Sequence, residues 1–235
     1  MGIIKATGSQ AKENAKKSDL DLNKIYLRLK DGESHKVRVL HMDDYAEYTA
    51  VADYNLDIYT QAVSEDSPLL VAHAKGGEKF KDLYPRSRYV MVFGSLQTGQ
   101  LVAWDCSKNQ FKSMVATIEE YEDVIDEIGF NLKRTGSGAS DTQYSLNPII
   151  KMKADEKEVF QSLEGTEVNM EFYEAIIVPK SDTFTATLLK NAGFDVATHL
   201  PHIDLSETEE GEAEPDTSAE EISKDNQDEN LLDLI

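Results

Sequence analysis

The 235-residue chain is predicted to be mainly β, with a small barrel of hairpins, accessory helices and an acidic C-terminal tail. Three observations carry this prediction. About seven short segments alternate apolar and polar residues between turn residues, as hairpin strands do. One long helical period separates two groups of these segments. Hydrophobic residues make up 40% of the chain, which is enough for a core, yet no run approaches the roughly 18 apolar residues of a membrane span.

The chain begins with a polar, lysine-bearing segment, residues 1–20, which has no sustained apolar period and is expected to form a flexible basic arm. Strict alternation then starts at residue 24 and continues to residue 30. The Asp31-Gly32 pair provides a turn, and alternation resumes over residues 36–39. This pattern predicts a first β-hairpin with one apolar face and one basic face.

Two further strands are expected at residues 44–52 and 56–61, where alternation includes several tyrosines. Residues 62–85 contain Pro68 and Pro85 and are expected to form a long irregular insertion. Insertions of this length are usually functional or mobile.

A second hairpin is predicted at residues 88–104, with its turn at 97–99. A helix should follow it, because Ser107 and Gln110 have the spacing of a capping box. Apolar residues keep helical spacing from there to residue 128, and Gly129 stands where such a helix would stop.

A third hairpin is expected to pair residues 130–135 with residues 143–151. Two short helices are expected near 155–163 and 182–192. After Pro201 the composition becomes rich in acidic residues and serine, which predicts a disordered tail.

Hairpins in this number, with one prominent helix between strand groups, favour the OB-fold. That fold is a five-stranded barrel, and the helix would lie between its third and fourth strands. A β-sandwich is the alternative. The barrel domain is expected to span residues 21–200, between the arm at 1–20 and the tail at 201–235.

The net charge of −20 is distributed unevenly along the chain. Residues 1–113 hold 15 acidic and 16 basic residues, residues 114–203 hold 16 and 7, and residues 204–235 hold 13 and 1. This asymmetry indicates a binding surface in the first half and a solvating tail in the second. The one cysteine, Cys106, excludes an internal disulfide framework, and the absence of a secretory pattern favours a cytoplasmic setting.

Catalytic chemistry is not predicted, because the chain has no P-loop, no HExxH, no GxSxG and no CxxC motif. His199 and His202 lie close together in the sequence, but with a single cysteine they make a weak case for a metal site. Cys106 is expected to be a buried thiol at the end of a strand. We therefore expect no catalytic residue, no metal ligand and no cofactor.

Basic and aromatic residues alternate in the predicted strands, which is the pattern of a surface that binds single-stranded nucleic acid. Lysine and arginine would neutralise phosphates, and flat side chains would stack on bases. Such alternation is also typical of the polar faces of half-buried strands. The candidate DNA-binding residues are Tyr26, Arg28, Lys30, Lys36, Arg38, Tyr45, Tyr48, Lys81, Arg86, Arg88, Tyr89, Trp104, Lys133, Arg134 and Tyr144.

The acidic tail ends in apolar residues, which a purely solvating tail would not need. Its apolar side chains could enter a partner's pocket while its acidic residues meet a basic rim. A solubilising tail with incidental leucines is the alternative. The candidate partner-binding residues are Asp228, Glu229, Leu231, Leu232, Asp233, Leu234 and Ile235.

Five runs of the chain carry a further signal: Ile25-Tyr-Leu-Arg-Leu-Lys-Asp-Gly-Glu, Phe80-Lys-Asp-Leu-Tyr-Pro-Arg-Ser-Arg-Tyr, Asp105-Cys-Ser-Lys-Asn-Gln, Lys133-Arg-Thr-Gly-Ser-Gly and Asp141-Thr-Gln-Tyr-Ser-Leu. These runs resemble bacteriophage single-stranded DNA-binding proteins of the helix-destabilising type. The resemblance covers residues 20–200 and includes the acidic tail. It implies an OB-fold that coats single strands during phage replication, recombination and repair, in the cytoplasm of the bacterial host.

The resemblance also implies that the acidic C-terminus recruits replication or recombination proteins. Some relatives carry a His/Cys zinc site in the insertion before the second hairpin. Here residues 64–77 contain no cysteine, so we expect that site to be lost. Self-association on DNA is a further expectation. The competing hypothesis is an interaction adaptor or acidic DNA mimic that binds no nucleic acid itself.

Overall fold

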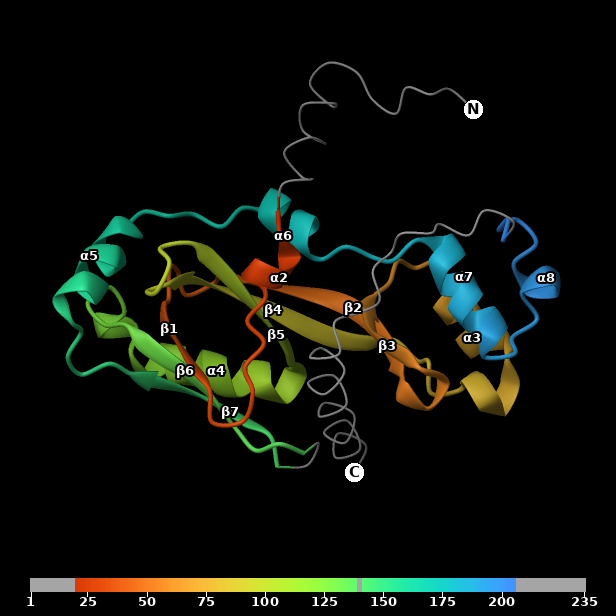
Figure 1. Cartoon of the computed structure of the whole chain (residues 1–235), viewed down its shortest axis with the longest axis horizontal. Helices are drawn as coiled ribbons and strands as arrows, with labels where there is room; N and C mark the ends of the chain where they lie inside the picture. The colour runs from red at the N-terminus through yellow and green to blue at the C-terminus, as the bar shows by residue number, and fades with distance from the viewer. Residues whose placement is uncertain (1–19, 139–140, 206–235) are drawn as a thin grey trace, which may run out of the picture.

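The computed structural model describes residues 20–138 and 141–205, which form one antiparallel sheet with helices around it (Figure 1). The flexible arm, the acidic tail and the apolar tip predicted from the sequence lie outside these residues, apart from their inner ends. The strands are β1 (Ser34–Arg38), β2 (Tyr45–Asp53), β3 (Ile58–Ala62), β4 (Arg86–Ser95), β5 (Leu101–Ser107), β6 (Phe130–Thr135) and β7 (Gln143–Pro148).

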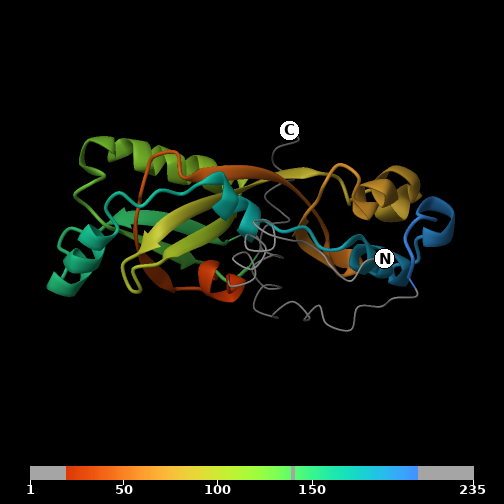
Figure 2. The same ribbon diagram turned by 90° about the horizontal axis from the view of Figure 1, so that it is seen from above.

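Helices pack around this sheet and also lie at both ends of the molecule. They are α2 (Leu22–Ile25), α3 (Pro68–Lys75), α4 (Lys108–Glu120), α5 (Ala154–Ser162), α6 (Met170–Ile176), α7 (Asp182–Asn191) and α8 (Val196–His199), with 3-10 turns η1 (Tyr54–Leu56), η2 (Gly77–Phe80) and η3 (Glu122–Val124). Seen from above, α3, α7 and α8 gather at one end of an elongated molecule and α5 lies at the other (Figure 2).

The longest strand, β4, organises the sheet. The strand order is β3-β2-β4-β1-β6-β7, and β5 pairs with β4. β4 thus pairs with β2, with β5 and, at its last residues, with β1. Within the described residues β5 and β7 do not pair with each other, so the sheet is open and the predicted barrel closure by strand pairing is absent. The mainly β architecture is confirmed.

The first predicted hairpin is wrong. The Asp31-Gly32 turn forms, and Gly32 adopts a φ of 77°, which glycine accepts without strain. The segment before the turn does not pair with β1, however. It begins as α2, and the Leu27 amide then donates to the Ala103 carbonyl of β5. β1 pairs with β6 instead, in a register that places Val37 opposite Phe130.

The other predicted strands and the main helix are confirmed in type and place. β2 pairs with β3, β4 with β5 and β6 with β7, all antiparallel. α4 starts at the predicted capping box of Ser107 and Gln110. It ends at Glu120 rather than near Gly129, because acidic residues such as Glu119 and Asp123 gather at its C-terminal end and oppose the helix dipole.

The predicted irregular insertion, residues 62–85, is instead largely helical. The Ser67 side chain accepts from the Leu69 amide and Pro68 occupies the first helical turn, so α3 has standard start signals. Leu69, Phe80 and Leu83 pack with residues of α7 and α8 in a second core cluster. The insertion and the C-terminal helices therefore build a small helical lobe beside β2 and β3 (Figure 1).

Both faces of the β4–β5 hairpin are covered. On one face Met91, Phe93 and Trp104 join the largest core cluster with Met114 of α4. On the other, Val90 and Val92 pack with residues of α2 and α6. The segment between α5 and α7 crosses this second face, and α6 is its middle part (Figures 1 and 2). Sequence reasoning missed α6, α8 and α2, each of which has seven residues or fewer.

Candidate nucleic-acid interface

The basic residues predicted to contact DNA divide into an inner and an outer set. Arg38, Arg88 and Arg134 are only 4%, 8% and 3% exposed, so they are structural in this conformation. Lys30 and Lys81 are exposed, whereas the remaining four are half-buried: Arg28, Lys36, Arg86 and Lys133. The expected single basic face of the first hairpin is therefore absent, because that hairpin does not form.

Arg88 of β4 is held by Asp105, the residue opposite Val90 on β5. Its Nε and Nη2 atoms donate to both carboxylate oxygens at 2.9–3.2 Å. The Tyr48 hydroxyl donates to the same carboxylate at 3.0 Å. Burial alone would lower the pKa of Arg88, but the Asp105 carboxylate raises it above its usual value. Burial and Asp105 also raise the pKa of Tyr48, so this hydroxyl stays protonated.

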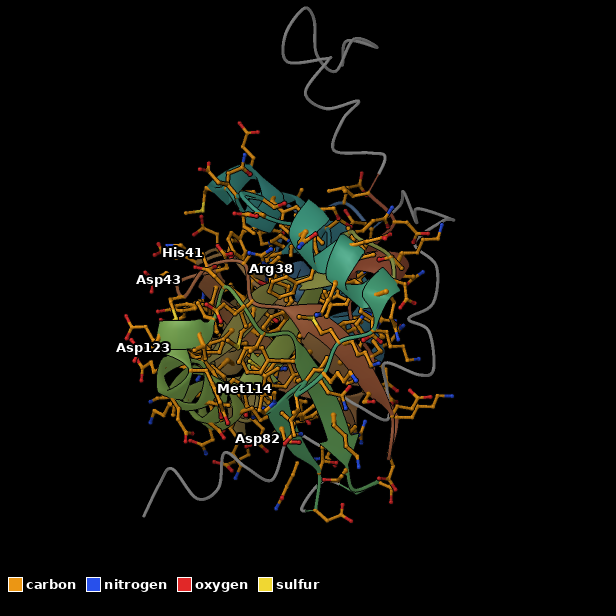
Figure 3. The ribbon with its side chains drawn as sticks, turned by 90° about the vertical axis from the view of Figure 1, so that its left-hand side faces the viewer. Arg38, His41, Asp43, Asp82, Met114 and Asp123 are labelled. Carbon is orange, nitrogen blue, oxygen red and sulfur yellow. The ribbon has the colours of Figure 1, made fainter. Side chains whose placement is uncertain are left out.

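Arg38 and Lys36 project from the outer face of β1 and are covered by α5. The Arg38 guanidinium stacks 4.2 Å from the centroid of the Phe160 ring, and its Nη1 donates to the Phe160 carbonyl. The Lys36 ammonium pairs with the Glu156 carboxylate. Figure 3 looks onto this end of the molecule and labels Arg38 beside α5.

Arg134 joins the turn after residue 30 to the loop between β6 and β7. Its Nη1 donates to the Leu29 carbonyl at 3.1 Å and its Nη2 to the Thr142 hydroxyl at 3.2 Å. The Gly136 amide donates to Asp31 in the same region. Arg134 thus fixes the backbone that carries Lys30 and Lys133.

Most of the tyrosines proposed to stack on bases are engaged within the protein. The Tyr26 hydroxyl donates to the Ile176 carbonyl of α6, and burial, with Asp105, raises its pKa. The Tyr89 ring stacks on Phe111 of α4 at 4.1 Å, and Tyr45 meets the same Phe111 edge-on at 4.9 Å. These rings cover the sheet rather than project from it.

Trp104 lies in the main core, where it is 2% exposed and 4.9 Å from the Tyr144 ring. The expectation that Trp104 stacks on bases therefore does not hold for this conformation. Cys106 is buried at the end of β5, as expected from the sequence.

Arg86 and Tyr84 form a half-buried basic and aromatic pair at the junction of the sheet and the helical lobe. The Arg86 guanidinium stacks 4.2 Å from the centroid of the half-exposed Tyr84 ring, and its Nη2 donates to the Asp82 carbonyl at 3.3 Å. Lys81, on the same short loop, is exposed and paired with Glu78. Sequence reasoning found Lys81 and Arg86 but missed Tyr84, although its spacing of two from Arg86 on an extended segment was a usable signal.

No group of three or more histidine, cysteine or carboxylate side chains within residues 20–138 and 141–205 is arranged to hold a metal ion. His199, one of the two histidines weighed as ligands, stacks on the Phe194 ring. In the same part of the chain, every helix is too short or too polar to cross a bilayer. The tail residues proposed to bind partners, 228–235, lie beyond the described residues.

Comparisons with known proteins find no family model that matches the chain and no matching curated protein. The site must therefore be interpreted from its own geometry.

Asp44, immediately before β2, is a polar group whose burial should make stability pH-dependent. Its Oδ2 atom and the Tyr173 hydroxyl of α6 are buried without a hydrogen-bond partner among the described residues. Burial raises the pKa of Asp44 to about 6. The native state therefore binds a proton more tightly than the unfolded state, and this group's contribution to stability falls as pH rises from about 4 to above 6.

Asp44→Asn should remove this loss of stability at higher pH. The full shift corresponds to about 3 kcal/mol, but Asp44 as a residue is only half-buried, and solvent screening reduces the expected gain to about 1 kcal/mol at pH 7.5. Urea unfolding at pH 4.5 and 7.5 checks this. A variant whose advantage over the unmodified chain is the same at both pH values would contradict it.

Proposed function

We propose that the protein binds single-stranded DNA without sequence preference and coats it during phage DNA replication, recombination and repair. The observation that carries this proposal is the half-buried stack of Arg86 on Tyr84, close in sequence to exposed Lys81. A positive charge beside a partly exposed aromatic ring is what phosphates and bases of an unpaired strand require.

Strand connectivity supports an OB-fold as the finer description. β1 pairs with β4 and β6, and α4 separates the β4–β5 hairpin from the β6–β7 hairpin. An OB-fold has this order, can be partly open, and binds oligonucleotides over its second and third strands and the flanking loops. In this chain those strands would be β4 and β5, whose two faces are covered, so the proposed contact lies on the flanking loops.

The two flanking connections carry the outer basic residues. The connection from β1 to β4 contributes Lys81 and Tyr84 and ends at Arg86. The connection from β6 to β7 lies against the turn that carries Lys30, because Arg134 and Asp31 hold the two together. Binding at these connections needs no rearrangement of the buried Arg88 and its half-buried partner Asp105.

Replacing Arg86 or Tyr84 with alanine tests the proposal. Each change should weaken binding to labelled oligo-dT about tenfold, within the roughly 1–3 kcal/mol of a base-stacking contact. Arg86→Ala should also reduce the slope of log affinity against log salt by about 0.7, the value for one phosphate on a single strand. Tyr84→Ala should leave that slope unchanged.

The matched control is Lys151→Ala, which removes an exposed positive charge from the segment before α5, away from this junction. It should change the affinity by less than about twofold. Equal losses for Lys151→Ala and Arg86→Ala would mean that only overall charge matters, and would remove the junction from the contact surface.

A further inference from the structure

The outer face of β1 carries two basic side chains that α5 contacts in the manner of a nucleic acid. Glu156 gives Lys36 a negative oxygen, as a phosphate would. The Phe160 ring gives Arg38 an aromatic face at 4.2 Å, as a base would, and the Phe160 carbonyl accepts from Arg38. Asp126 of the segment after η3 lies 3.7 Å from the same guanidinium.

The contact leaves one donor unfilled. Arg38 is 4% exposed, yet its Nε has no hydrogen-bond partner among the described residues. A buried donor without an acceptor costs about 1–3 kcal/mol, so a permanent structural role for α5 would be expected to fill it. An acceptor such as a phosphate oxygen could reach this donor only after the residues packed over it moved, because the atom is buried.

The apolar attachment of α5 is small. Phe160 and Leu163 pack with Leu96 in a satellite cluster of three buried residues, whereas the main core cluster has thirteen. α5 is also joined to α6 by an extended connection along the sheet (Figure 1). Regions with few buried apolar contacts open at lower free energy than the core does.

We propose that α5 is an internal substitute for nucleic acid on β1, and that a bound single strand displaces it to reach Lys36 and Arg38. This inference rests on the proposed function and extends the DNA path from the outer loops onto the outer face of β1. It also accounts for two basic residues that alternate on a strand yet lie beneath a helix.

Glu156→Gln is the variant that tests this. It removes the negative charge that pairs with the Lys36 ammonium. The new amide oxygen can still accept from the Lys153 backbone amide, as the carboxylate does. Glu158→Gln is the matched control, because Glu158 is an exposed acid of the same helix. The variants carry the same charge change, so any difference in affinity reports the contact with Lys36.

Glu156→Gln should bind oligo-dT about fivefold more tightly than Glu158→Gln, with a salt slope steeper by about 0.7. Adding Lys36→Ala should cancel that gain. In the unmodified chain, oligo-dT should lower the hydrogen-exchange protection of residues 154–163. Equal affinities of the two glutamine variants would overturn this inference but not the proposed function. Unchanged or greater hydrogen-exchange protection of residues 154–163 on binding would do the same. No binding by the unmodified chain and both variants would overturn the proposed function as well.

Discussion

Replacing Asp105 with alanine should lower the free energy of unfolding by about 3–5 kcal/mol, because it leaves the buried Arg88 guanidinium without its counter-charge. The Tyr48 hydroxyl would lose its acceptor at the same time. In a chain of this size the change corresponds to a decrease of about 10 °C in Tm. Urea and thermal unfolding monitored by circular dichroism measure both quantities.

A double variant separates the cost of an unpaired charge from the worth of the pair. Arg88→Met with Asp105→Leu removes both charges and keeps similar volume, so it should be less destabilising than Asp105→Ala alone. Lys81→Ala is the control for an exposed pair, and losing the contact with Glu78 should leave the stability nearly unchanged. If the double variant lost as much free energy of unfolding as Asp105→Ala, side-chain volume rather than charge would dominate at this site.

Truncating Trp104 to alanine should cost about 3–5 kcal/mol, because the indole is 2% exposed and fills the main core between the sheet and α4. Trp104→Phe should cost less, since it keeps an aromatic ring against Tyr144. Denaturant unfolding of the two variants gives these values.

The same pair of variants distinguishes a core role from a base-stacking role. Trp104→Phe should bind oligo-dT with affinity within about twofold of the unmodified chain, whereas loss of a stacking residue costs roughly 1–3 kcal/mol. Emission from the single tryptophan should stay blue-shifted when oligo-dT is added. A tenfold loss of affinity with unchanged stability would place Trp104 in the DNA contact.

The sequence predicted well those elements whose signals are local. The capping box at Ser107 placed the start of α4, and period-two alternation located β2 to β7. The pairing partner of the first predicted strand, by contrast, is not encoded in local signals. Residues 24–30 have hairpin alternation and a good turn at Asp31-Gly32, but tertiary contacts with β5 and β6 decide their neighbours. Alternation shows which residues share a face of a strand, but it does not show which other strand pairs with it.

The candidate site was harder to predict, because burial on both faces of a strand cannot be read from alternation alone. Arg88 and Arg38 occupy polar positions of an alternating pattern and would be exposed on a sheet with one open face. The short helices α5 and α6 cover those positions, and α6 was not predicted. Spacing identified Arg86, but the stack on Tyr84 depends on how the loop at Asp82 folds back.

The central claim is most directly tested by titrating the full chain with labelled oligo-dT and with duplex DNA over a series of salt concentrations. We predict binding to oligo-dT that weakens steeply with salt, as counterion release from phosphates requires, and much weaker binding to the duplex. No binding to oligo-dT at low salt would contradict the account and favour an interaction adaptor without nucleic-acid affinity.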